Sequence, residues 1–299
     1  MRRLILGCGY LGRRVANRWL DAGDDVWAVT RSAERAESLR QAGMQPVVWD
    51  VTNESVEELP LADTVLFAVG YDRSANHPIH SVYVDGLART LDRLPANTGR
   101  FIYISSTGVY SQNDGQWVDE DSPAEPNRDG GRACLAAEQL LTGHPLGQRM
   151  IILRLAGIYG PDRIPRRADL LAGKPIAANP NSYLNLIQVE DAADIVVTVA
   201  AADLSLPKLY TVSDGNPALR ADYYAELSRL LDAPPPTFQF ADAVPAASAP
   251  ETKSPNSRRS TGDKRISNQR LTQELPIRFH YPTYRHGLAD AVERLGGET

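Results

Sequence analysis

Cysteine is scarce in this chain of 299 residues, which holds only Cys8 and Cys134. Two cysteines, one of them inside a glycine-rich turn, do not make the disulfide framework of a small secreted protein. We therefore expect a reducing compartment, the cytoplasm. Long apolar runs are missing as well, since no stretch approaches the roughly 18 residues of a membrane-spanning helix. We expect no membrane partner.

Charge of one sign is not in excess either, because 32 Lys and Arg stand against 37 Asp and Glu, a net charge of −5. This balance gives no reason to expect nucleic acid as a partner. Metal-ligand spacing is also absent, so we expect no metal site. The histidines without such spacing are His77, His80, His144, His280 and His286.

What the chain does have is a glycine-rich turn directly after a short apolar run. Residues 4–6 are followed by Gly7-Cys8-Gly9-Tyr10-Leu11-Gly12, a G-x-G-x-x-G spacing. In a dinucleotide site, Gly7 permits the turn, Gly9 lets the backbone approach a pyrophosphate, and Gly12 lets the helix pack close to the strand. The helix N-terminus offers free N–H groups to the anion. A second apolar run at 25–29 completes a βαβ unit, which favours a nucleotide site over mere tight packing.

The end of the second expected strand bears on which dinucleotide binds. An acidic residue about 20 residues beyond the glycines binds the ribose 2′-hydroxyl of NAD, whereas an arginine accommodates the 2′-phosphate of NADP. Here Arg31 and Ser32 stand at this position, and Arg35 follows one turn later. We therefore predict NADP(H) in preference to NAD(H). The alternative is that Arg31 is a solvated residue at a strand end.

Short apolar runs alternate with helical patterns through the first half of the chain. In runs such as 64–69, 100–105 and 150–155, nearly every residue is apolar, which is typical of parallel strands covered on both faces. The pattern predicts an α/β fold, a doubly wound parallel sheet of Rossmann type. We place an NADP-binding domain at 1–155 and a smaller C-terminal substrate-binding part, interleaved with the last sheet elements, at 156–299.

Other segments accompany the glycine turn: Asp50 closing the third strand, Ala68-Val69-Gly70 closing the fourth, and residues 105–110, 153–161 and 185–193 further on. Together they resemble the short-chain dehydrogenase/reductase superfamily, and more narrowly its extended and atypical branch, the NAD-dependent epimerase/dehydratase proteins. The resemblance implies that Asp50 meets the adenine and that residues 68–70 lie along the adenosine ribose. It also implies cofactor contacts from the turn, including Tyr10 and Leu11.

The resemblance implies a catalytic serine or threonine as well, which Ser106 matches. In the family this hydroxyl bonds the substrate oxygen, while a tyrosine, its pKa lowered by a lysine four residues on, exchanges a proton as hydride moves to or from the nicotinamide. Here those two positions fall on Gly130 and Cys134. No tyrosine stands four residues before any lysine of the chain, which are Lys174, Lys208, Lys253 and Lys264.

The chain offers substitutes for the missing acid. Tyr110 follows the serine, Tyr159 follows the sixth strand, and Asp119-Glu120-Asp121 lies between them. We single out Tyr110 as the candidate acid beside Ser106. The alternative for each tyrosine is a packing role, and for the acidic run a solvated loop.

Two functions remain open. One is an NADP-dependent oxidoreductase or epimerase, acting with non-standard acid–base residues on a small or nucleotide-linked polar substrate. The other is a catalytically silent NADP-binding redox sensor or scaffold. The basic residues between Arg258 and Arg265 either close over an anionic substrate or form a solvated loop. The sequence leaves open the substrate's identity and the choice between a monomer and a homodimer.

Overall fold

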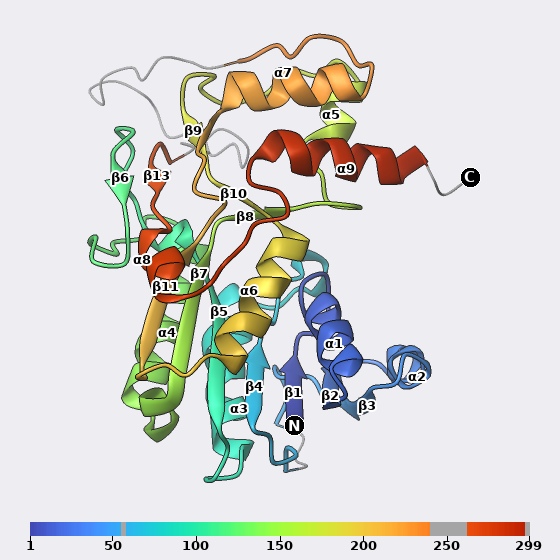
Figure 1. Ribbon diagram of the computed structural model, residues 1–299, viewed down its shortest axis with the longest axis vertical. Coiled ribbons are helices and arrows are strands. Elements are labelled where there is room, and N and C mark those ends of the chain that lie inside the picture. Colours follow the sequence, from blue (N-terminus) through green and yellow to red (C-terminus); the bar gives the residue numbers. More distant parts are fainter. Residues whose placement is uncertain (55–57, 240–261, 297–299) are drawn as a thin grey trace.

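A parallel sheet of seven strands forms the centre of the computed structural model, which describes residues 1–54, 58–239 and 262–296 (Figure 1). Its strand order is β11-β7-β5-β4-β1-β2-β3. Every neighbouring pair is parallel, as the apolar runs predict. The strands are β1 (Arg2–Leu6), β2 (Asp25–Thr30), β3 (Gln45–Val48), β4 (Thr64–Phe67), β5 (Arg100–Ser106), β7 (Met150–Leu155) and β11 (Lys208–Val212).

Helices cover both faces of this sheet, which confirms the predicted doubly wound α/β fold. On β1, Ile5 packs with residues of α1 (Gly12–Asp21) and α6 (Val189–Ala201), among them Val15 and Ile195. Leu4 and Leu6 point the other way, because successive side chains of a strand alternate between faces. Their face is covered by α3 (Gly86–Arg93) and α4 (Asp129–Gly143). The helix α2 (Ala33–Gln41) packs beside β2 and β3.

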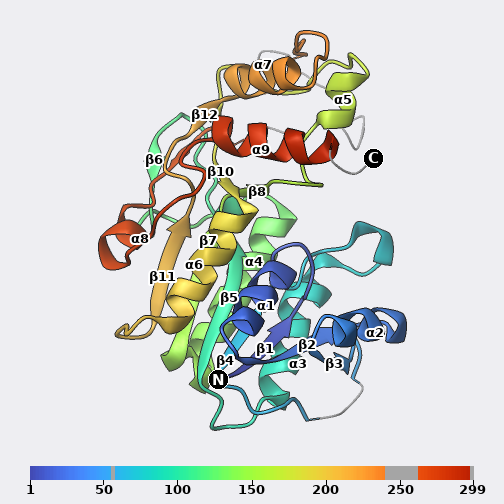
Figure 2. The ribbon, with the colours of Figure 1, turned by 45° about the vertical axis from the view of Figure 1, so that its right-hand side comes forward.

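A smaller layer lies beyond the carboxyl ends of the strands, as both ribbon views show (Figure 2). Its own apolar core includes Tyr159, Tyr223, Leu227 and Leu288. The elements of the layer and its surroundings are β8 (Gly157–Tyr159), β10 (Leu186–Gln188), β9 (Tyr183–Leu184), β12 (Ala218–Leu219), β6 (Trp117–Val118), β13 (Arg265–Ile266), α5 (Arg167–Leu171), α7 (Arg220–Leu230), α8 (Gln269–Glu274) and α9 (Tyr284–Gly296).

The two parts of the chain share the sheet. Both α6 and β11 come after residue 155, yet β11 is the edge strand beside β7 and α6 covers the sheet beside α1. The division at residue 155 therefore stays a prediction about organisation. None of the helices in the described ranges is long and apolar enough to cross a membrane.

The third and fourth strands end earlier than their sequence patterns predict. β3 stops at Val48, so Asp50 lies in the turn after the strand rather than closing it. The Asp50 carboxylate accepts hydrogen bonds from the N–H and hydroxyl of Thr52, at 2.9 and 2.7 Å, and these bonds turn the chain. Likewise β4 stops at Phe67, and residues 68–70 form the connection beyond it.

Candidate functional site

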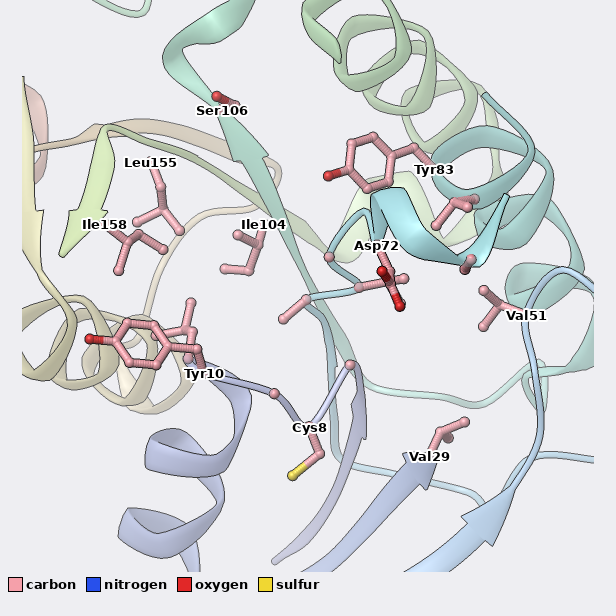
Figure 3. A pocket seen from close by; sticks show the side chains of 18 of the residues that line it. Cys8, Tyr10, Val29, Val51, Asp72, Tyr83, Ile104, Ser106, Leu155 and Ile158 are labelled. Atoms are coloured by element: carbon pink, nitrogen blue, oxygen red, sulfur yellow. The ribbon is translucent and has the colours of Figure 1, made fainter. Parts of the chain in front are cut away.

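A cavity of about 580 Å³ opens beyond the carboxyl ends of β1, β2, β4, β5 and β7 (Figure 3). It extends from Arg31 and Arg35 past the glycine turn to Ser106 and Cys134. This is the edge of a parallel α/β sheet at which ligands bind. The sequence-predicted residues that line it are Gly7, Gly9, Tyr10, Leu11, Arg31, Arg35, Asp50, Ala68, Val69, Gly70 and Ser106.

The three glycines of the turn serve different physical purposes. Gly7 has φ +89°, and a Cβ there would lie 2.4 Å from the carbonyl oxygen of Ala68. A Cβ on Gly12 would lie 2.4 Å from the carbonyl oxygen of Gly7, so Gly12 permits helix α1 to start against the turn. Around Gly9, nothing lies within 4 Å of a built Cβ. Gly9 therefore leaves open space in the cavity that a side chain would fill.

The start of α1 presents unpaired N–H groups to this open space. The Gly9 N–H is used locally, on the Gly7 carbonyl at 2.8 Å, and the Arg13 N–H donates to the Gly9 carbonyl at 3.0 Å. Among the described residues, none accepts the N–H of Leu11 or Gly12. Free N–H groups at a helix start, next to a turn without side chains, suit a phosphate group.

Two arginines, Arg31 and Arg35, also line the cavity. The Arg35 guanidinium donates to the Cys8 carbonyl at 2.8 Å, which holds it against the glycine turn. Arg31 donates to the carboxylate of Asp72 at 3.1 Å, and both side chains are about half exposed. Hydrogen bonds from Ser74, with Arg31 adding to them, lower the pKa of Asp72 to about 2. The Ser32 hydroxyl accepts the Arg35 N–H at 3.1 Å and caps α2, and Ser32 does not line the cavity.

Tyr10 joins the glycine turn to the second half of the chain. Its hydroxyl donates to the Pro161 carbonyl at 2.7 Å. The guanidinium of Arg14 lies 4.4 Å and that of Arg163 lies 5.6 Å from the centre of its ring. Tyr10 therefore forms a wall of the cavity where the two parts of the chain meet.

Ser106 is the last residue of β5 and faces the cavity. Its Oγ accepts the N–H of Gly108 at 3.0 Å, which starts the short turn Thr107–Val109. No acceptor for the hydrogen of this hydroxyl lies in the part of the chain that the structure describes. Ser106 is thus positioned to donate a hydrogen bond to a bound molecule.

The structure places Tyr110 away from the cavity. Its side chain is 2% exposed, and its hydroxyl accepts a hydrogen bond of 2.8 Å from Arg154. Arg154 in turn forms a buried ion pair with Glu138 at 2.6 Å. Burial raises the pKa of Tyr110 to about 12. The geometry gives Tyr110 a packing role, the alternative to the predicted acid, because the turn after Ser106 points its side chain inward.

Tyr159 does not line the cavity either. It is fully buried in the core of the smaller layer, and a Cβ on Gly287 of α9 would lie 2.1 Å from its hydroxyl oxygen. This close approach of α9 shows that the Tyr159 hydroxyl fills a packed interior site. Its environment matches the packing alternative.

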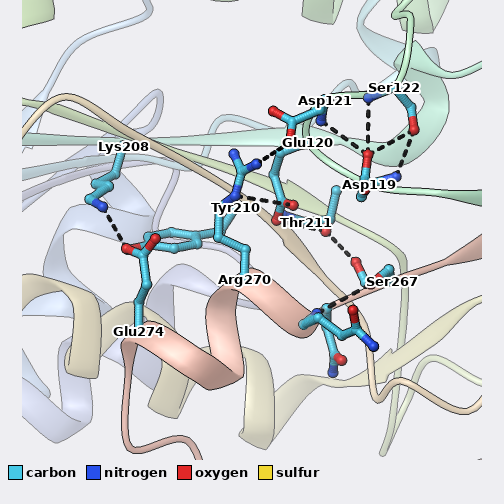
Figure 4. A network of polar contacts seen from close by, with 12 residues as sticks. Asp119, Glu120, Asp121, Ser122, Lys208, Tyr210, Thr211, Ser267, Arg270 and Glu274 are labelled. Atoms are coloured by element: carbon cyan, nitrogen blue, oxygen red, sulfur yellow. Dashed lines mark hydrogen bonds and ion pairs between the residues drawn. The ribbon is translucent and has the colours of Figure 1, made fainter.

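The acidic run holds α8 and β11 in place (Figure 4). Asp119 accepts the N–H and hydroxyl of Ser122, and the buried Glu120 accepts the N–H and hydroxyl of Thr211 at 2.7 and 2.9 Å. Asp121 pairs with Arg270 of α8 at 2.5 Å. These carboxylates are structural acceptors, Asp121 stays mostly exposed as the solvated-loop alternative has it, and none of the three lines the cavity.

A model of the NAD dependent epimerase/dehydratase family matches residues 4–212, which is more than half of the chain. The chain belongs to this family. Protein YeeZ of Escherichia coli (strain K12) is 28% identical over 288 residues, covering 93% of this chain and 95% of YeeZ.

Solved structures show the same family fold. A functionally unknown conserved protein from Silicibacter pomeroyi DSS is 28% identical, with a TM-score of 0.75 over 100% of this chain and 99% of that one. A putative NAD-dependent epimerase/dehydratase from Methylobacillus flagellatus is 26% identical, with a TM-score of 0.75 over 99% and 98%. UDP-glucose 4-epimerase from Bifidobacterium longum, solved with NAD+ and UDP, is 17% identical with a TM-score of 0.77 over 100% and 99%, a likeness of fold.

The positions that the sequence resemblance assigns to the family tyrosine and lysine lie on α4. Gly130 is in its first turn, and a Cβ there would lie 3.6 Å from the Ile79 side chain. Cys134 follows one turn later, is buried and lines the cavity. Burial raises the pKa of the Cys134 thiol to about 12, so it is neutral at physiological pH. Neither position supplies an acid or a cation.

Tyr83 was missed by the sequence reasoning. It comes from a π-helical turn, η2 (Ser81–Asp85), directly before α3, and its half-buried side chain lines the cavity with Ser106 and Cys134. Figure 3 shows the Tyr83 hydroxyl pointing from its helical segment toward the cavity. The helical pattern of residues 79–94 carries no sign of this orientation, because the π turn changes which side chains face the sheet.

A second cavity, of about 440 Å³, carries a concentration of arginine. Arg73, Arg128, Arg166 and Arg220 line it. Residues that are near in sequence line the two cavities, Asp72 and Arg163 the first, and Arg73, Pro165 and Arg166 the second. Burial lowers the pKa of Arg220.

The basic segment is described from Gly262 onward. Lys264 donates to the Tyr110 carbonyl at 2.8 Å, and burial lowers its pKa to about 8. Arg265 donates to the Gly115 carbonyl at 2.7 Å. These two side chains are therefore bound to the protein, unlike those of a solvated loop. Arg258 and Arg259 lie outside the described residues.

Proposed function

We propose that this chain is an NADP(H)-dependent oxidoreductase or epimerase with a non-standard acid–base group. The observation that carries this proposal is one continuous cavity that joins the open backbone at Gly9 to the free hydroxyl of Ser106. A nicotinamide dinucleotide fits the residues present. Gly9 has no Cβ to fill the space next to the turn, and the N–H groups of Leu11 and Gly12 have no acceptor among the described residues. When bound, the cofactor supplies or accepts a hydride.

Arg31 and Arg35 support NADP over NAD. Both line the end of the cavity next to Asp50 and the end of β2, and no acidic side chain stands at the end of β2 to bind a ribose 2′-hydroxyl. A 2′-phosphate would replace Asp72 as the partner of Arg31. A charge-assisted bond to phosphate contributes about 1.5–3 kcal/mol, which corresponds to an affinity for NADPH about 10- to 150-fold higher than for NADH. Because Arg31 is half exposed, we expect the lower end of this range.

The arginine-lined cavity supports an anionic, nucleotide-linked substrate. Four arginines line this second cavity, of which Arg166 is paired with Asp169 at 2.9 Å, and their charge favours an anionic group such as a diphosphate. Solved structures of the same fold include epimerases in complex with UDP or UDP-sugars. We further propose that the protein acts in the cytoplasm, as a monomer or homodimer.

Cofactor titrations test the proposal. NADPH and NADH dissociation constants would be measured by nicotinamide fluorescence for the wild type, Arg31→Ala and, as a matched control, Arg40→Ala. Arg40 is an exposed arginine on helix α2, which begins two residues after Arg31, and it pairs with Glu37 outside the cavity. We expect Arg31→Ala to weaken NADPH about 10-fold or more while leaving NADH unchanged. Equal NADPH and NADH affinities in the wild type would refute the cofactor assignment.

The absence of an acid and a cation at Gly130 and Cys134 favours a second candidate, a catalytically silent NADP-binding sensor or scaffold. A positioned acid contributes about 10²–10⁴ in rate, so its loss without a substitute removes efficient chemistry. Tight NADPH binding without turnover of any carbonyl substrate supports this candidate. Cofactor oxidation that depends on Ser106 supports the enzyme.

A further inference from the structure

Tyr83 faces the part of the cavity where the family dyad is missing. Its ring packs in a cluster with Val109 and Cys134, between η2 and α4. At Gly130 and Cys134 the side chains of α4 are short, and η2, which carries Tyr83, packs against α4. The π turn that presents Tyr83 is a local departure from α-helix, and such turns occur frequently at functional sites.

The Tyr83 hydroxyl oxygen accepts a hydrogen bond from the protein, whereas its hydrogen is not donated to any described residue. The backbone N–H of Tyr71 donates to its oxygen at 3.2 Å, and the ring of Tyr71 meets the Tyr83 ring edge to face. Within the described ranges, no residue accepts the hydrogen of the Tyr83 hydroxyl. Tyr71 differs, because its own hydroxyl donates to the His77 carbonyl at 2.9 Å. Tyr83 therefore has a proton to offer to a molecule in the cavity.

We propose that Tyr83 is the proton donor of this site and acts with Ser106 on the substrate oxygen in place of the family tyrosine. The inference rests on the proposed function, since it requires a bound dinucleotide. In carbonyl reduction the C=O π bond breaks, the carbon gains the hydride, and the oxygen gains the proton of Tyr83. The phenolate left on Tyr83 accepts the Tyr71 N–H and regains its proton from water at the open mouth of the cavity.

The surroundings of Tyr83 keep its hydroxyl protonated and can stabilise the phenolate that donation leaves. Burial raises the pKa of Tyr83 above its ordinary value of 10, so the hydroxyl keeps its proton at neutral pH. The Tyr71 N–H bond and the positive charge of Arg163 oppose this increase, and both stabilise the phenolate once it forms. The neutral Cys134 thiol provides no cation comparable to the family lysine.

A distance measurement tests the placement without relying on activity. The chain would be deuterated except at tyrosine rings, saturated with NADPH, and examined for nuclear Overhauser cross-peaks from the hydrogens at nicotinamide C4. We expect a cross-peak to a tyrosine ring that is absent from Tyr83→Phe and present in Tyr110→Phe. NADPH binding without this cross-peak overturns the role of Tyr83. Failure to bind NADPH instead overturns the proposed function.

Kinetics on the same samples test the chemistry. NADPH oxidation would be followed with 9,10-phenanthrenequinone, an activated dicarbonyl probe. We expect Tyr83→Phe to lower kcat about 10²- to 10⁴-fold with an unchanged NADPH dissociation constant, and Tyr110→Phe to lower it far less. Equal turnover in the wild type and Tyr83→Phe overturns the proposal. A cross-peak without wild-type turnover also counts against a proton donor and supports the silent NADP-binding candidate.

Discussion

Replacing Gly9 by alanine should weaken cofactor binding without lowering the stability of the fold. Nothing lies within 4 Å of a Cβ at Gly9, and its φ is negative, so alanine fits the folded chain. Such Gly→Ala changes stabilise a protein by about 0.4–1 kcal/mol, because the unfolded chain loses freedom. The methyl group would nevertheless occupy the space of the pyrophosphate. Losing one charge-assisted N–H bond to phosphate costs about 1.5–3 kcal/mol, a rise of about 10- to 150-fold in the NADPH Kd.

Gly7→Ala should give the opposite pattern at the same turn. Its φ of +89° is unfavourable for alanine, which costs about 1–2 kcal/mol. The new Cβ would also lie 2.4 Å from the Ala68 carbonyl oxygen and 2.6 Å from the Val69 nitrogen, backbone atoms that move only if the chain after β4 shifts. Overpacking of this kind costs about 1–3 kcal/mol more. We expect a loss of about 2–5 kcal/mol in the free energy of unfolding.

Urea unfolding without cofactor and NADPH titration of the folded chain measure the two effects separately. The expected result is a stable Gly9→Ala variant that binds poorly and an unstable Gly7→Ala variant. Wild-type NADPH affinity in Gly9→Ala would refute the placement of the pyrophosphate at this turn. Wild-type stability in Gly7→Ala would refute the turn geometry itself.

Two further predictions concern buried charge. Glu138→Gln leaves the Arg154 guanidinium buried without its carboxylate, and urea unfolding should show a loss of about 3–5 kcal/mol; a loss below 1 kcal/mol would contradict the ion pair. Burial raises the pKa of Asp214 to about 7, so the folded chain holds this proton to higher pH than the unfolded chain does. The contribution of Asp214 to the free energy of unfolding should therefore fall by at most about 4 kcal/mol between pH 4 and pH 7. Asp214→Asn should remove most of that fall, and an unchanged pH profile would contradict the assignment.

Local patterns carried much of the information about the fold. Apolar runs predict parallel strands because both faces of each strand are covered, and the observed pairs are all parallel. The glycine spacing predicts a strand, a turn and a helix start, and the structure has β1 and α1 on either side of that turn. Strand ends were predicted less well, since the stop at Val48 depends on a turn bond between Thr52 and Asp50.

Side-chain directions in the site were the harder part. Ser106 and Tyr110 are four residues apart, yet Ser106 faces the cavity and Tyr110 faces Arg154, which comes from another strand. Sequence gave no sign of this partner, because the contact joins residues 44 positions apart. The same holds for Glu120, whose acceptor role depends on Thr211 of β11.

The sequence by itself determined that a glycine turn and a helix start follow the first strand and that two arginines follow the second. These features are local, and their chemistry depends on neighbouring residues. Only the tertiary structure decided which hydroxyls line one cavity. Tyr83 and Ser106 both line it, and η2, which carries Tyr83, packs against α4. Such packing depends on how helices lie on a sheet, which the periodicity of a single segment does not specify.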